Sequence, residues 1–449
     1  MIEIGKEYSL SITDVALPSA FGVARAGEMV VFVPGLVPGD KARIRIARLD
    51  KRFGYGEAVE LEERSAFREK PVCAHFGECG GCDLQQLAYE KQLEIKQNHL
   101  LQALKRIGGI HLEEVDISDI VPSVDRFFYR NKVEFSFGED AGGQTILGLN
   151  EPVSPLHPYT GAIMPVRECC LFSPAAAKML PHVREFVERS GLKAHNPTSG
   201  KGSLKRLVMR EAKQSGEILI NIVSESGIAG QLAGLAQTLK EAMPQLASVY
   251  TTTGNRTTLL WGRPYLEETV CDLVLRIYPL SFFQPNPRTA EELYKTIIPE
   301  AGISRNEHVA GLYCGSGAIE LCLARRVKEV RGIDSSKDSI ACAKENAAAN
   351  GLENCSFFRD RAERAGVHCP PDRRDVVIID PPRSGITKEA LRAIVEMRPR
   401  KLIYISCNPS TFARDLRSLA QEYEPKHIIP FDFFPHTGHF EVLSLLERP

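Results

Sequence analysis

Three side chains suited to covalent and proton-transfer chemistry lie beside short apolar runs near the C-terminal end of the sequence. Cys407 follows the β-prone run 402–405, after which the sequence turns to Asn-Pro. Asp380 follows the strand-like run 375–379, and two prolines after it stop the strand. Glu441 opens the final apolar run. Open α/β sheets place active sites at strand ends, so we expect these groups to act together, although a lone cysteine is more often a core residue.

A glycine-containing turn at 314–317 indicates a binding site for an adenosyl cofactor. The turn follows the apolar run 309–313, and Asp334 closes the next such run after a helical segment. Glycine permits close approach of a ligand, and an acid in this place binds ribose hydroxyls or caps the next helix. The third glycine of a dinucleotide fingerprint is missing, because Glu320 occupies its position. The pattern therefore favours S-adenosylmethionine, which has no pyrophosphate.

Cys73, Cys79 and Cys82 form a compact cysteine motif in a glycine-rich loop. Glycines let the backbone curl closely around a ligand, and three thiolates at this spacing require a fourth from elsewhere. The adjacent Cys169 and Cys170 are the nearest candidates. Four thiolates hold either zinc or an iron-sulfur cluster, and the spacing does not decide between them. Core cysteines without a ligand are the weaker alternative, because a Cys-x-x-Cys lies in the loop.

The C-terminal motifs resemble those of the RNA uracil-C5 methyltransferase family. They are Asp-Pro-Pro-Arg at 380–383, Ser-Cys-Asn-Pro-Ser-Thr at 406–411 and Phe-Pro-His-Thr-Gly-His-Phe-Glu at 434–441, in the family's order. The resemblance extends over nearly the whole chain. It implies that Cys407 is the catalytic nucleophile and that Glu441 is the base that abstracts a proton.

The resemblance also implies residues that hold two cofactors. The contacts to S-adenosyl-L-methionine would come from Gln284, Tyr313, Asp334 and Asp380. The ligands of a [4Fe-4S] cluster would be Cys73, Cys79, Cys82 and Cys169, with Cys170 standing where the family often has proline. Two positions depart from the family: Gly311 replaces the aspartate usual before Leu-Tyr-Cys-Gly, and Ala318 lies where many members have asparagine. Either departure would weaken cofactor binding unless a neighbouring residue offsets it.

The implied reaction follows from the chemistry of uracil. C5 of uracil is a poor nucleophile, and addition of the Cys407 thiolate to C6 turns C5 into an enolate carbon. After C5 has attacked the cofactor's methyl group, Glu441 removes the remaining proton and the thiol is expelled. Asp380 would hold the uracil edge or orient the cofactor, and Phe283 would stack on an extruded base.

Residues 1–66 are rich in β-formers and turn signals, which is typical of a small barrel. Ile44 and Ile46 alternate with Arg43 and Arg45, so one strand face is apolar and the other carries guanidiniums. Guanidiniums suit phosphates, but a solvated outer face explains the charges equally well. The segment resembles the TRAM domain, an OB-like RNA-binding barrel, and this resemblance implies a contact with RNA.

The 449-residue chain is expected to form three domains in an α/β fold. Expected are a TRAM-like β-barrel at 1–66, a central α+β iron-sulfur and RNA-binding domain at 67–269, and a Rossmann-like class I methyltransferase domain at 270–449. Strands and helices alternate in the last of these, as in a doubly wound sheet. The amphipathic run 89–107 predicts a helix, and the resemblance implies that segment 85–116 packs back on the methyltransferase domain.

Composition limits the setting in which the protein works. The sequence has no apolar run near the roughly 18 residues of a membrane span, and its start lacks the regions of a signal peptide. Twelve cysteines without a secretion signal favour thiols or metal ligation over disulfides. We therefore expect a cytoplasmic protein with no membrane contact and no obligate protein partner. A net charge of −1 leaves RNA affinity to local patches.

The expected substrate is a uridine in RNA, and 23S rRNA is preferred over transfer RNA. Bacterial family members that act on the transfer RNA T-loop look like the catalytic and central parts alone, whereas this sequence has a barrel and a cysteine motif as well. A transfer RNA m5U methyltransferase is the closest alternative. A methyltransferase for exocyclic amines would need neither Cys407 nor Glu441, and a non-catalytic iron-sulfur RNA-binding protein is supported only by Gly311 and Ala318.

Overall fold

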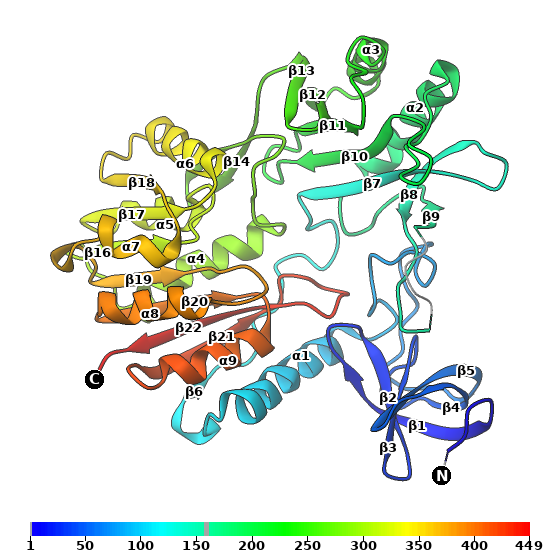
Figure 1. Cartoon of the computed structure of the whole chain (residues 1–449), viewed down its shortest axis with the longest axis horizontal. Helices are drawn as coiled ribbons and strands as arrows, with labels where there is room; N and C mark the ends of the chain where they lie inside the picture. Colours follow the sequence, from blue (N-terminus) through cyan, green and yellow to red (C-terminus); the bar gives the residue numbers. More distant parts are fainter. Residues whose placement is uncertain (1, 157–160) are drawn as a thin grey trace.

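The computed structural model describes residues 2–156 and 161–449. An N-terminal barrel, a central sheet with two helices and a larger α/β body that contains the C-terminus are arranged side by side (Figure 1). Within the described residues, no helix has the length and apolar character needed to cross a membrane. The fold class expected from the sequence is confirmed.

Five strands close the N-terminal barrel in the order β1-β2-β3-β5-β4. They are β1 (Glu7–Ala16), β2 (Phe21–Ala26), β3 (Met29–Val33), β4 (Lys41–Leu49) and β5 (Phe53–Glu63). Ile44 and Ile46 are fully buried in the barrel interior together with Val31, whereas Arg43 and Arg45 are exposed. The alternation along β4 therefore has the expected direction, because successive side chains of a strand point to opposite faces.

The central sheet has seven strands in the order β13-β12-β11-β10-β7-β8-β9. They are β7 (Lys132–Glu139), β8 (Thr145–Asn150), β9 (Ile163–Pro165), β10 (Leu204–Glu211), β11 (Ile218–Ser224), β12 (Leu246–Thr253) and β13 (Arg256–Gly262). Helices α2 (Ala175–Ser190) and α3 (Ala233–Ala242) share one buried core with this sheet. A separate hairpin of β14 (Leu266–Val270) and β15 (Leu273–Ile277) leads into the C-terminal body.

The C-terminal body is built on eight strands in the order β18-β17-β16-β19-β20-β22-β21-β6. They are β6 (Asp116–Ile117), β16 (His308–Leu312), β17 (Glu329–Asp334), β18 (Cys355–Arg359), β19 (Val376–Ile379), β20 (Lys401–Ser406), β21 (Glu424–Phe431) and β22 (Glu441–Glu447). The strands from β18 to β20 are parallel, and β22 runs antiparallel to both of its neighbours. Parallel strands place their carboxyl ends at one edge, where active sites of such sheets lie.

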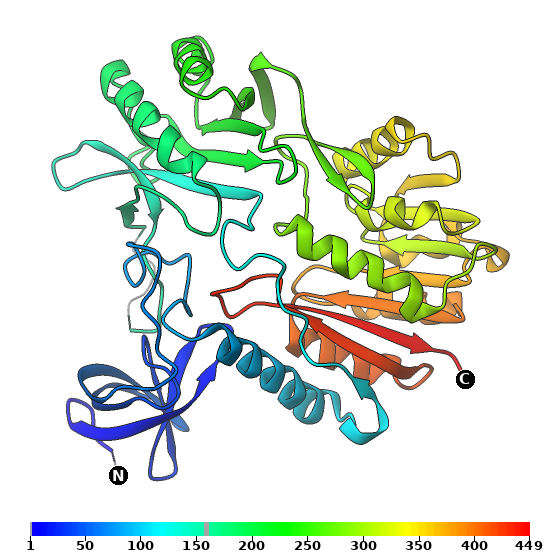
Figure 2. The same ribbon diagram turned by 180° about the vertical axis from the view of Figure 1, so that it is seen from behind.

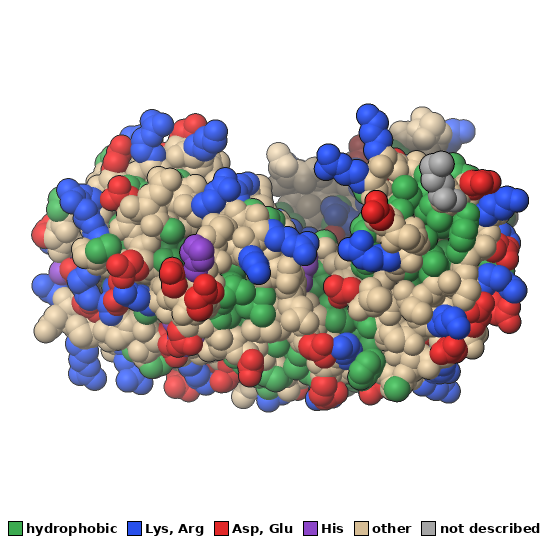
Figure 3. Space-filling model, turned by 90° about the horizontal axis from the view of Figure 1, so that it is seen from below, with side chains coloured by type: hydrophobic (Ala, Val, Ile, Leu, Met, Phe, Trp, Pro, Cys, Tyr) green, Lys and Arg blue, Asp and Glu red, His purple; other side chains and the backbone are tan. Residues whose placement is uncertain are grey.

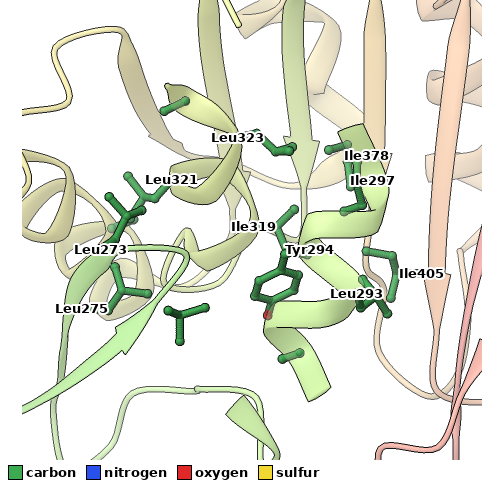
Figure 4. Packing of buried hydrophobic residues seen from close by; sticks show 14 of the residues in the cluster. Leu273, Leu275, Leu293, Tyr294, Ile297, Ile319, Leu321, Leu323, Ile378 and Ile405 are labelled. Carbon is green, nitrogen blue, oxygen red and sulfur yellow. The ribbon is translucent and has the colours of Figure 1, made fainter. Parts of the chain in front are cut away.

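Helices cover both faces of this sheet, as the alternating sequence pattern predicts. One face carries α4 (Pro287–Ala301), α5 (Ala318–Ala324) and α6 (Lys337–Ala349), and the other carries α1 (Tyr89–Ala103), α7 (Ala365–His368), α8 (Lys388–Met397) and α9 (Pro409–Leu419). Figure 4 shows Tyr294 of α4 and Ile319 of α5 in the first of these cores, with Ile378 and Ile405 of the strands. Asn286 caps α4 through its side chain and Pro287 begins it, whereas Gly302 ends it in the left-handed conformation.

Helix α1 belongs to the packing of the C-terminal body although it comes early in the sequence. It lies against α9 in both ribbon views (Figures 1 and 2), and Leu100 shares a buried core with Phe412 and Leu416. A single π-helical turn, η1 (Leu104–Gly108), extends α1, and Gly109 ends it with a φ of 65°. The short 3-10 turns are η2 (Leu112–Glu114), η3 (Ala362–Arg364) and η4 (Pro371–Arg373). After η2, β6 pairs with β21 and completes the edge of the sheet.

Candidate functional site

The thiol and the glutamate expected to react face each other across two adjacent strands. β20 pairs with β22 in antiparallel register, with Ser406 opposite Val442. Cys407 directly follows Ser406 and Glu441 directly precedes Val442, so the two side chains come from the same end of the strand pair, and the Glu441 charge acts on the thiol. Cys407 is half-buried, whereas Glu441 is only 4% exposed. The thiol is therefore accessible and the carboxyl lies behind it.

The loop after β19 is hydrogen-bonded to the loop that carries Cys407. Asn408 caps α9 by accepting a hydrogen bond from the Ser410 N–H at 3.1 Å, and its amide donates to the Arg383 carbonyl at 3.1 Å. Thr411 Oγ1 also donates to the Arg383 carbonyl, at 3.3 Å. These two bonds join the motifs at 380–383 and 406–411, since Asn408 and Thr411 both donate to the Arg383 carbonyl.

Burial and two neighbouring carboxyls oppose ionisation of the Cys407 thiol. Burial raises the pKa of Cys407 to about 11, and the neighbouring Glu441 and Asp380 carboxyls add to that rise. Burial also raises the pKa of Asp380 to about 7 and that of Glu441 well above its usual range. Arg383 lowers the pKa of both Cys407 and Glu441. The site thus combines a thiol, two carboxyls that burial disposes to hold protons, and one guanidinium that favours their charged forms.

The segment before Glu441 is fixed by residues from the first quarter of the chain. Lys96 and Asp432 are both 0% exposed and form an ion pair with 2.6 Å between Nζ and Oδ1. The Tyr89 hydroxyl donates to Asp432 Oδ2 at 2.8 Å. The backbone N–H groups of Asp83 and Leu84 donate to the carbonyl of His436 at 3.0 Å each. Removing one partner of a buried ion pair strongly destabilises a protein, because the other charge is left unpaired. Contacts from α1 and from the cysteine loop therefore hold the segment that leads to Glu441.

The four residues expected to contact the cofactor lie around the carboxyl ends of β16, β17 and β19. Asp334 Oδ2 accepts a hydrogen bond from the Gly315 N–H at 3.0 Å. Tyr313 begins the same turn with a φ of 61°, which is uncommon for a residue other than glycine. The Gln284 amide donates to Asp380 Oδ2 at 3.5 Å. The four residues are therefore brought to one edge of the sheet.

The aromatic residue expected to stack on an extruded base is corrected by the structure. Phe283 is only 9% exposed and belongs to the core beside α4, whereas Phe282 is 58% exposed. The Phe282 carbonyl accepts a hydrogen bond from Ser316 Oγ at 3.2 Å, which ties this loop to the glycine turn. The sequence offers two adjacent phenylalanines, and only the fold shows which of them faces solvent.

Five cysteines line a single cavity of about 270 Å³ between the early loop and the central sheet. They are the three of the motif at 73–82 together with Cys169 and Cys170. Within the described parts of the chain, no three His, Cys, Asp or Glu side chains are grouped closely enough to bind one metal ion. A tetrahedral zinc site brings its sulfurs to about 3.8 Å from one another, given a Zn–S bond near 2.3 Å. The thiols are thus spread around a cavity instead of converging on one point.

Polar groups around this cavity are directed at the thiols. Gln85 accepts a hydrogen bond from the Cys73 N–H at 3.1 Å and its amide contacts Cys82 Sγ at 3.2 Å. Burial raises the pKa of Cys79 to about 11 and of Cys82 to about 12, whereas the positive charge of Arg130 lowers both. Nε of Arg130 is buried and has no hydrogen-bond partner among the described residues. An anionic group in the cavity would satisfy this guanidinium.

Comparisons with known proteins agree with these motifs. Residues 212–449 match the model of the tRNA (Uracil-5-)-methyltransferase family. An uncharacterized RNA methyltransferase of Clostridium acetobutylicum is 33% identical over 100% of this chain and 98% of its own length. One from Caldanaerobacter subterraneus is 35% identical over 100% of this chain and 99% of its own length. The chain belongs to the RNA uracil-5-methyltransferase family.

Two further matches cover the remaining parts of this RNA methyltransferase. Residues 2–59 match the TRAM domain, which confirms the resemblance of the barrel. The structure of the Pyrococcus abyssi tRNA (uracil-54, C5)-methyltransferase in complex with S-adenosyl-L-homocysteine aligns with a TM-score of 0.75 and 27% identity. That alignment covers 97% of this chain and 100% of the Pyrococcus chain, so the likeness includes the barrel and the central sheet as well as the C-terminal body.

The arginine row on the TRAM barrel is already neutralised by acids. Arg43 forms ion pairs with Glu7 and Glu60, and Arg45 pairs with Glu7. The guanidiniums expected to meet phosphates are therefore engaged within the barrel, because the acids on the neighbouring strands lie opposite them. The sequence could not show this, since Glu60 comes from β5 and Glu7 from β1.

A different face of the TRAM barrel carries a partly exposed aromatic group. The Tyr55 ring lies 5.8 Å from Phe32 and 5.7 Å from Phe53 between centroids, and Phe21 lies 6.5 Å from Tyr55. The Arg48 guanidinium lies 5.8 Å from the Tyr55 ring centroid. Aromatic rings with a nearby guanidinium are suited to stacking with bases of single-stranded RNA.

We expect Glu441→Gln to stabilise the folded enzyme more at pH 8 than at pH 5. Burial holds the pKa of Glu441 above its value in the unfolded chain, so folding opposes loss of its proton. Stability contributed by the protonated form is therefore lost as pH rises from the unfolded pKa, near 4.3, toward the folded pKa. Glutamine removes this penalty, and each kcal/mol recovered raises Tm by about 2–4 °C. Thermal unfolding at both pH values measures the effect.

The exposed Glu389 on α8 provides the matched control for this measurement. Glu389→Gln should change Tm little at either pH value, because substitutions of exposed residues usually change stability by less than about 0.5 kcal/mol. If Glu441→Gln showed the same pH-independent behaviour, the buried carboxyl would not carry the penalty assigned to it.

Proposed function

We propose that this enzyme methylates C5 of a uridine in RNA with S-adenosyl-L-methionine, through a covalent bond between Cys407 and C6. The observation that carries the proposal is the pairing of β20 with β22, which brings the half-buried thiol of Cys407 and the buried Glu441 to the same end of two adjacent strands. Asp380 ends the neighbouring strand β19 beside them. A methyltransferase for exocyclic amines would leave this thiol and glutamate without a role.

The reaction begins with addition of the Cys407 thiolate to C6. The electron pair of the C5–C6 double bond moves toward C5 and O4, and C5 becomes nucleophilic. Burial raises the pKa of the Cys407 thiol to about 11, which disfavours the thiolate in the free enzyme. Arg383 favours the thiolate, because its positive charge lowers the pKa of Cys407. The substrate would bind next to Arg383, so that the Cys407 thiolate forms beside C6 of the uracil.

The second half of the reaction uses Glu441. S-adenosyl-L-methionine supplies an electrophilic methyl group, and C5 takes this methyl as the sulfonium becomes a neutral thioether. Glu441 then removes the proton from C5, the double bond re-forms, and the Cys407 thiolate leaves from C6. Burial raises the pKa of Glu441, which makes its carboxylate a stronger base than an exposed glutamate. Because Glu441 is buried, water is also kept away from the C5 proton that its carboxylate removes.

We infer that Gln284, Tyr313, Asp334 and Asp380 hold S-adenosyl-L-methionine. Asp334 lies at the carboxyl end of β17, where an acid binds ribose hydroxyls, and it also fixes the glycine turn through the Gly315 N–H. Gln284 reaches Asp380, so these two side chains form the opposite wall. The Pyrococcus enzyme that matches over nearly the whole chain is in complex with S-adenosyl-L-homocysteine, the product of such a transfer.

We also propose that Cys73, Cys79, Cys82 and Cys169 hold a [4Fe-4S] cluster. A cavity of about 270 Å³ fits a group with several metal ions, since in such a cluster each thiolate binds a different iron. The buried Arg130 Nε without a partner fits an anionic group. Cys169 influences the pKa of both Cys79 and Cys82, which supports it as the fourth ligand. The cluster would fix the loop that donates to His436 before Glu441.

We place the target uridine in 23S rRNA, with a transfer RNA uridine as the second candidate. The aromatic face of the barrel adds an RNA contact beyond the flipped nucleotide, which supports a large folded substrate. The Pyrococcus tRNA (uracil-54, C5)-methyltransferase favours the second candidate. Because that alignment covers 97% of this chain, the presence of a barrel does not by itself separate the two substrates.

We propose three domains, namely a barrel at 1–66, a central domain at 67–269 and a methyltransferase domain at 270–449, with segment 85–116 packed on the last of these. Figure 3 shows a hollow in the surface of the molecule, with Lys and Arg side chains and some acidic side chains around it. A hollow with basic groups around it is suited to a folded RNA that reaches the edge of the sheet. We further propose that the enzyme works in the cytoplasm.

A competition between RNA transcripts tests the proposed substrate. RNA labelled with tritium at C5 of uridine releases tritium when C5 is methylated, so the rate follows the reaction directly. We expect the purified enzyme to release tritium faster from fragments of 23S rRNA than from a transfer RNA T-loop transcript. Faster release from the T-loop would establish the second candidate instead. Absence of release from both, with intact cofactor binding, would contradict C5 methylation.

We expect Tyr55→Ala to weaken RNA binding about tenfold. Stacking of a base on an aromatic ring contributes about 1–3 kcal/mol, and Tyr55 is at the centre of the aromatic group. Arg43→Ala is the matched control, because Arg43 is already paired with two acids and should change affinity less than twofold. Fluorescence anisotropy with labelled RNA at two salt concentrations measures both variants. If Arg43→Ala lost more RNA affinity than Tyr55→Ala, the arginine row would be the RNA-binding face instead.

A further inference from the structure

Gly311 and Glu320 share one space beneath the cofactor edge of the sheet. Gly311 lies in β16, one residue before its end, and Glu320 lies on α5 after the glycine turn. A Cβ placed on Gly311 would stand 2.7 Å from Cδ and 2.8 Å from Cγ of Glu320, and closer still to Oε1. The Glu320 carboxyl therefore fills the place that a side chain at position 311 would take. Gly311 is one of the two departures from the family sequence noted above.

The Glu320 carboxyl is buried and incompletely satisfied. Glu320 is only 2% exposed, and its Oε2 has no hydrogen-bond partner among the described residues. Burial raises its pKa to about 8, and the charges of Asp380 and Asp334 add to the rise. Three carboxyls thus act on one another around the glycine turn. A buried carboxylate with a free oxygen and like charges beside it has a strong requirement for a cationic hydrogen-bond donor.

We propose that Glu320 supplies the carboxylate that Gly311 lacks, and that it binds the α-ammonium group of the cofactor's methionine moiety. The inference rests on the proposed use of S-adenosyl-L-methionine. The carboxylate has moved from the strand to the helix that packs against it, and the glycine at 311 makes room for it. The departure at 311 is then compensated at 320, which removes the reason to regard the cofactor site as impaired.

The chemistry of the cofactor selects the ammonium group. S-adenosyl-L-methionine carries two positive centres, its sulfonium and its α-ammonium. Only the ammonium has N–H donors, and an unpaired carboxylate oxygen requires a donor. Asp334, at the end of the next strand, is placed for the ribose instead. The two acids therefore bind opposite ends of the same molecule.

Calorimetry on the full chain with two ligands tests this assignment. S-adenosyl-L-homocysteine keeps the ammonium group, whereas 5′-methylthioadenosine has the same adenosine and thioether without the amino-acid part. We expect Glu320→Gln to weaken binding of S-adenosyl-L-homocysteine about 10- to 100-fold, as loss of a charge-assisted hydrogen bond does. Binding of 5′-methylthioadenosine should change less than about twofold, because it makes no contact that depends on the carboxylate. Equal loss for both ligands, or no loss for either, would overturn the proposal.

An exchange of the two positions gives a second and independent measurement. Gly311→Asp alone should lower Tm and cofactor affinity, because its side chain meets Glu320. Gly311→Asp combined with Glu320→Ala should restore affinity for S-adenosyl-L-homocysteine to within about fivefold of the natural chain, since a carboxylate is again present in the shared space. A double variant as weak as Glu320→Ala alone would contradict the exchange. If the natural chain bound neither ligand, the proposed cofactor itself would be wrong.

Discussion

Cys407→Ala should abolish methylation, with a loss of at least about 10⁴-fold in turnover, because removal of a nucleophile leaves only binding and positioning. Without addition to C6, C5 has no enolate character and cannot attack a methyl group. Tritium release and incorporation of labelled methyl into RNA measure the two halves of the reaction separately. Both should vanish, whereas binding of S-adenosyl-L-homocysteine should persist, since Cys407 is in the loop after β20 and Asp334 ends β17.

Cys355→Ala is the matched control for loss of a thiol. Cys355 is half-buried at the start of the edge strand β18, which β17, β16 and β19 separate from β20. Its substitution should leave turnover within about twofold of the natural enzyme, because the thiol takes no part in the proposed reaction and alanine removes only one partly buried atom. Retained turnover in Cys407→Ala would falsify the covalent mechanism and return the exocyclic-amine alternative.

Glu441→Gln is expected to fail at a later step than Cys407→Ala. Its thiol still adds to C6 and C5 still takes the methyl group, but the C5 proton has no base to accept it. The Cys407–C6 bond then cannot be broken, so a covalent complex of RNA and protein should accumulate and survive denaturing electrophoresis. The double variant Cys407→Ala with Glu441→Gln should form none. Absence of a stable complex in Glu441→Gln would assign the proton abstraction to another group, of which Asp380 is the nearest carboxyl.

The sequence points to the proposed reactive groups because each belongs to a short local signal. Asp380 and Cys407 follow the parallel strands β19 and β20, and Glu441 opens the antiparallel strand β22, whose reversed direction brings its first residue to the same edge. The doubly wound pattern is likewise local, since each helix and each strand has its own periodicity of apolar residues in the sequence. Both levels of prediction therefore agree with the fold.

Groups that support the site through long-range contacts were not predictable from the sequence. Lys96 and Asp432 are separated by 336 residues, and a lysine inside an amphipathic helix is usually on the solvated face. Their pairing depends on how α1 packs against the C-terminal body, which no local pattern reports. Glu320 is a similar case, because in the sequence its only distinctive feature is that it occupies the third glycine position of a dinucleotide fingerprint. Its role becomes visible through the space that Gly311 leaves.

The enzyme purified without oxygen should be brown and contain about four iron and four sulfide ions per chain. Five cysteines line the cavity, so the structure alone offers one thiol more than a cluster requires. The electrostatic neighbours distinguish the two candidates for the fourth ligand. Cys169 interacts electrostatically with Cys73, Cys79 and Cys82, and Cys170 interacts with Cys73. A fourth ligand must be near the whole triplet, and this condition selects Cys169.

Cys169→Ser and Cys170→Ser form a matched pair, since they make the same change at adjacent positions. We expect Cys169→Ser to lose most of its iron and its visible absorption, and Cys170→Ser to retain both. Turnover should fall in Cys169→Ser as well, because the loop that contains Cys82 donates through Asp83 and Leu84 to His436, ahead of Glu441. Loss of the cluster would loosen that support and misplace the base. Iron retained in Cys169→Ser and lost in Cys170→Ser would exchange the ligand assignment, and stoichiometric zinc without iron would replace the cluster by a single-ion site.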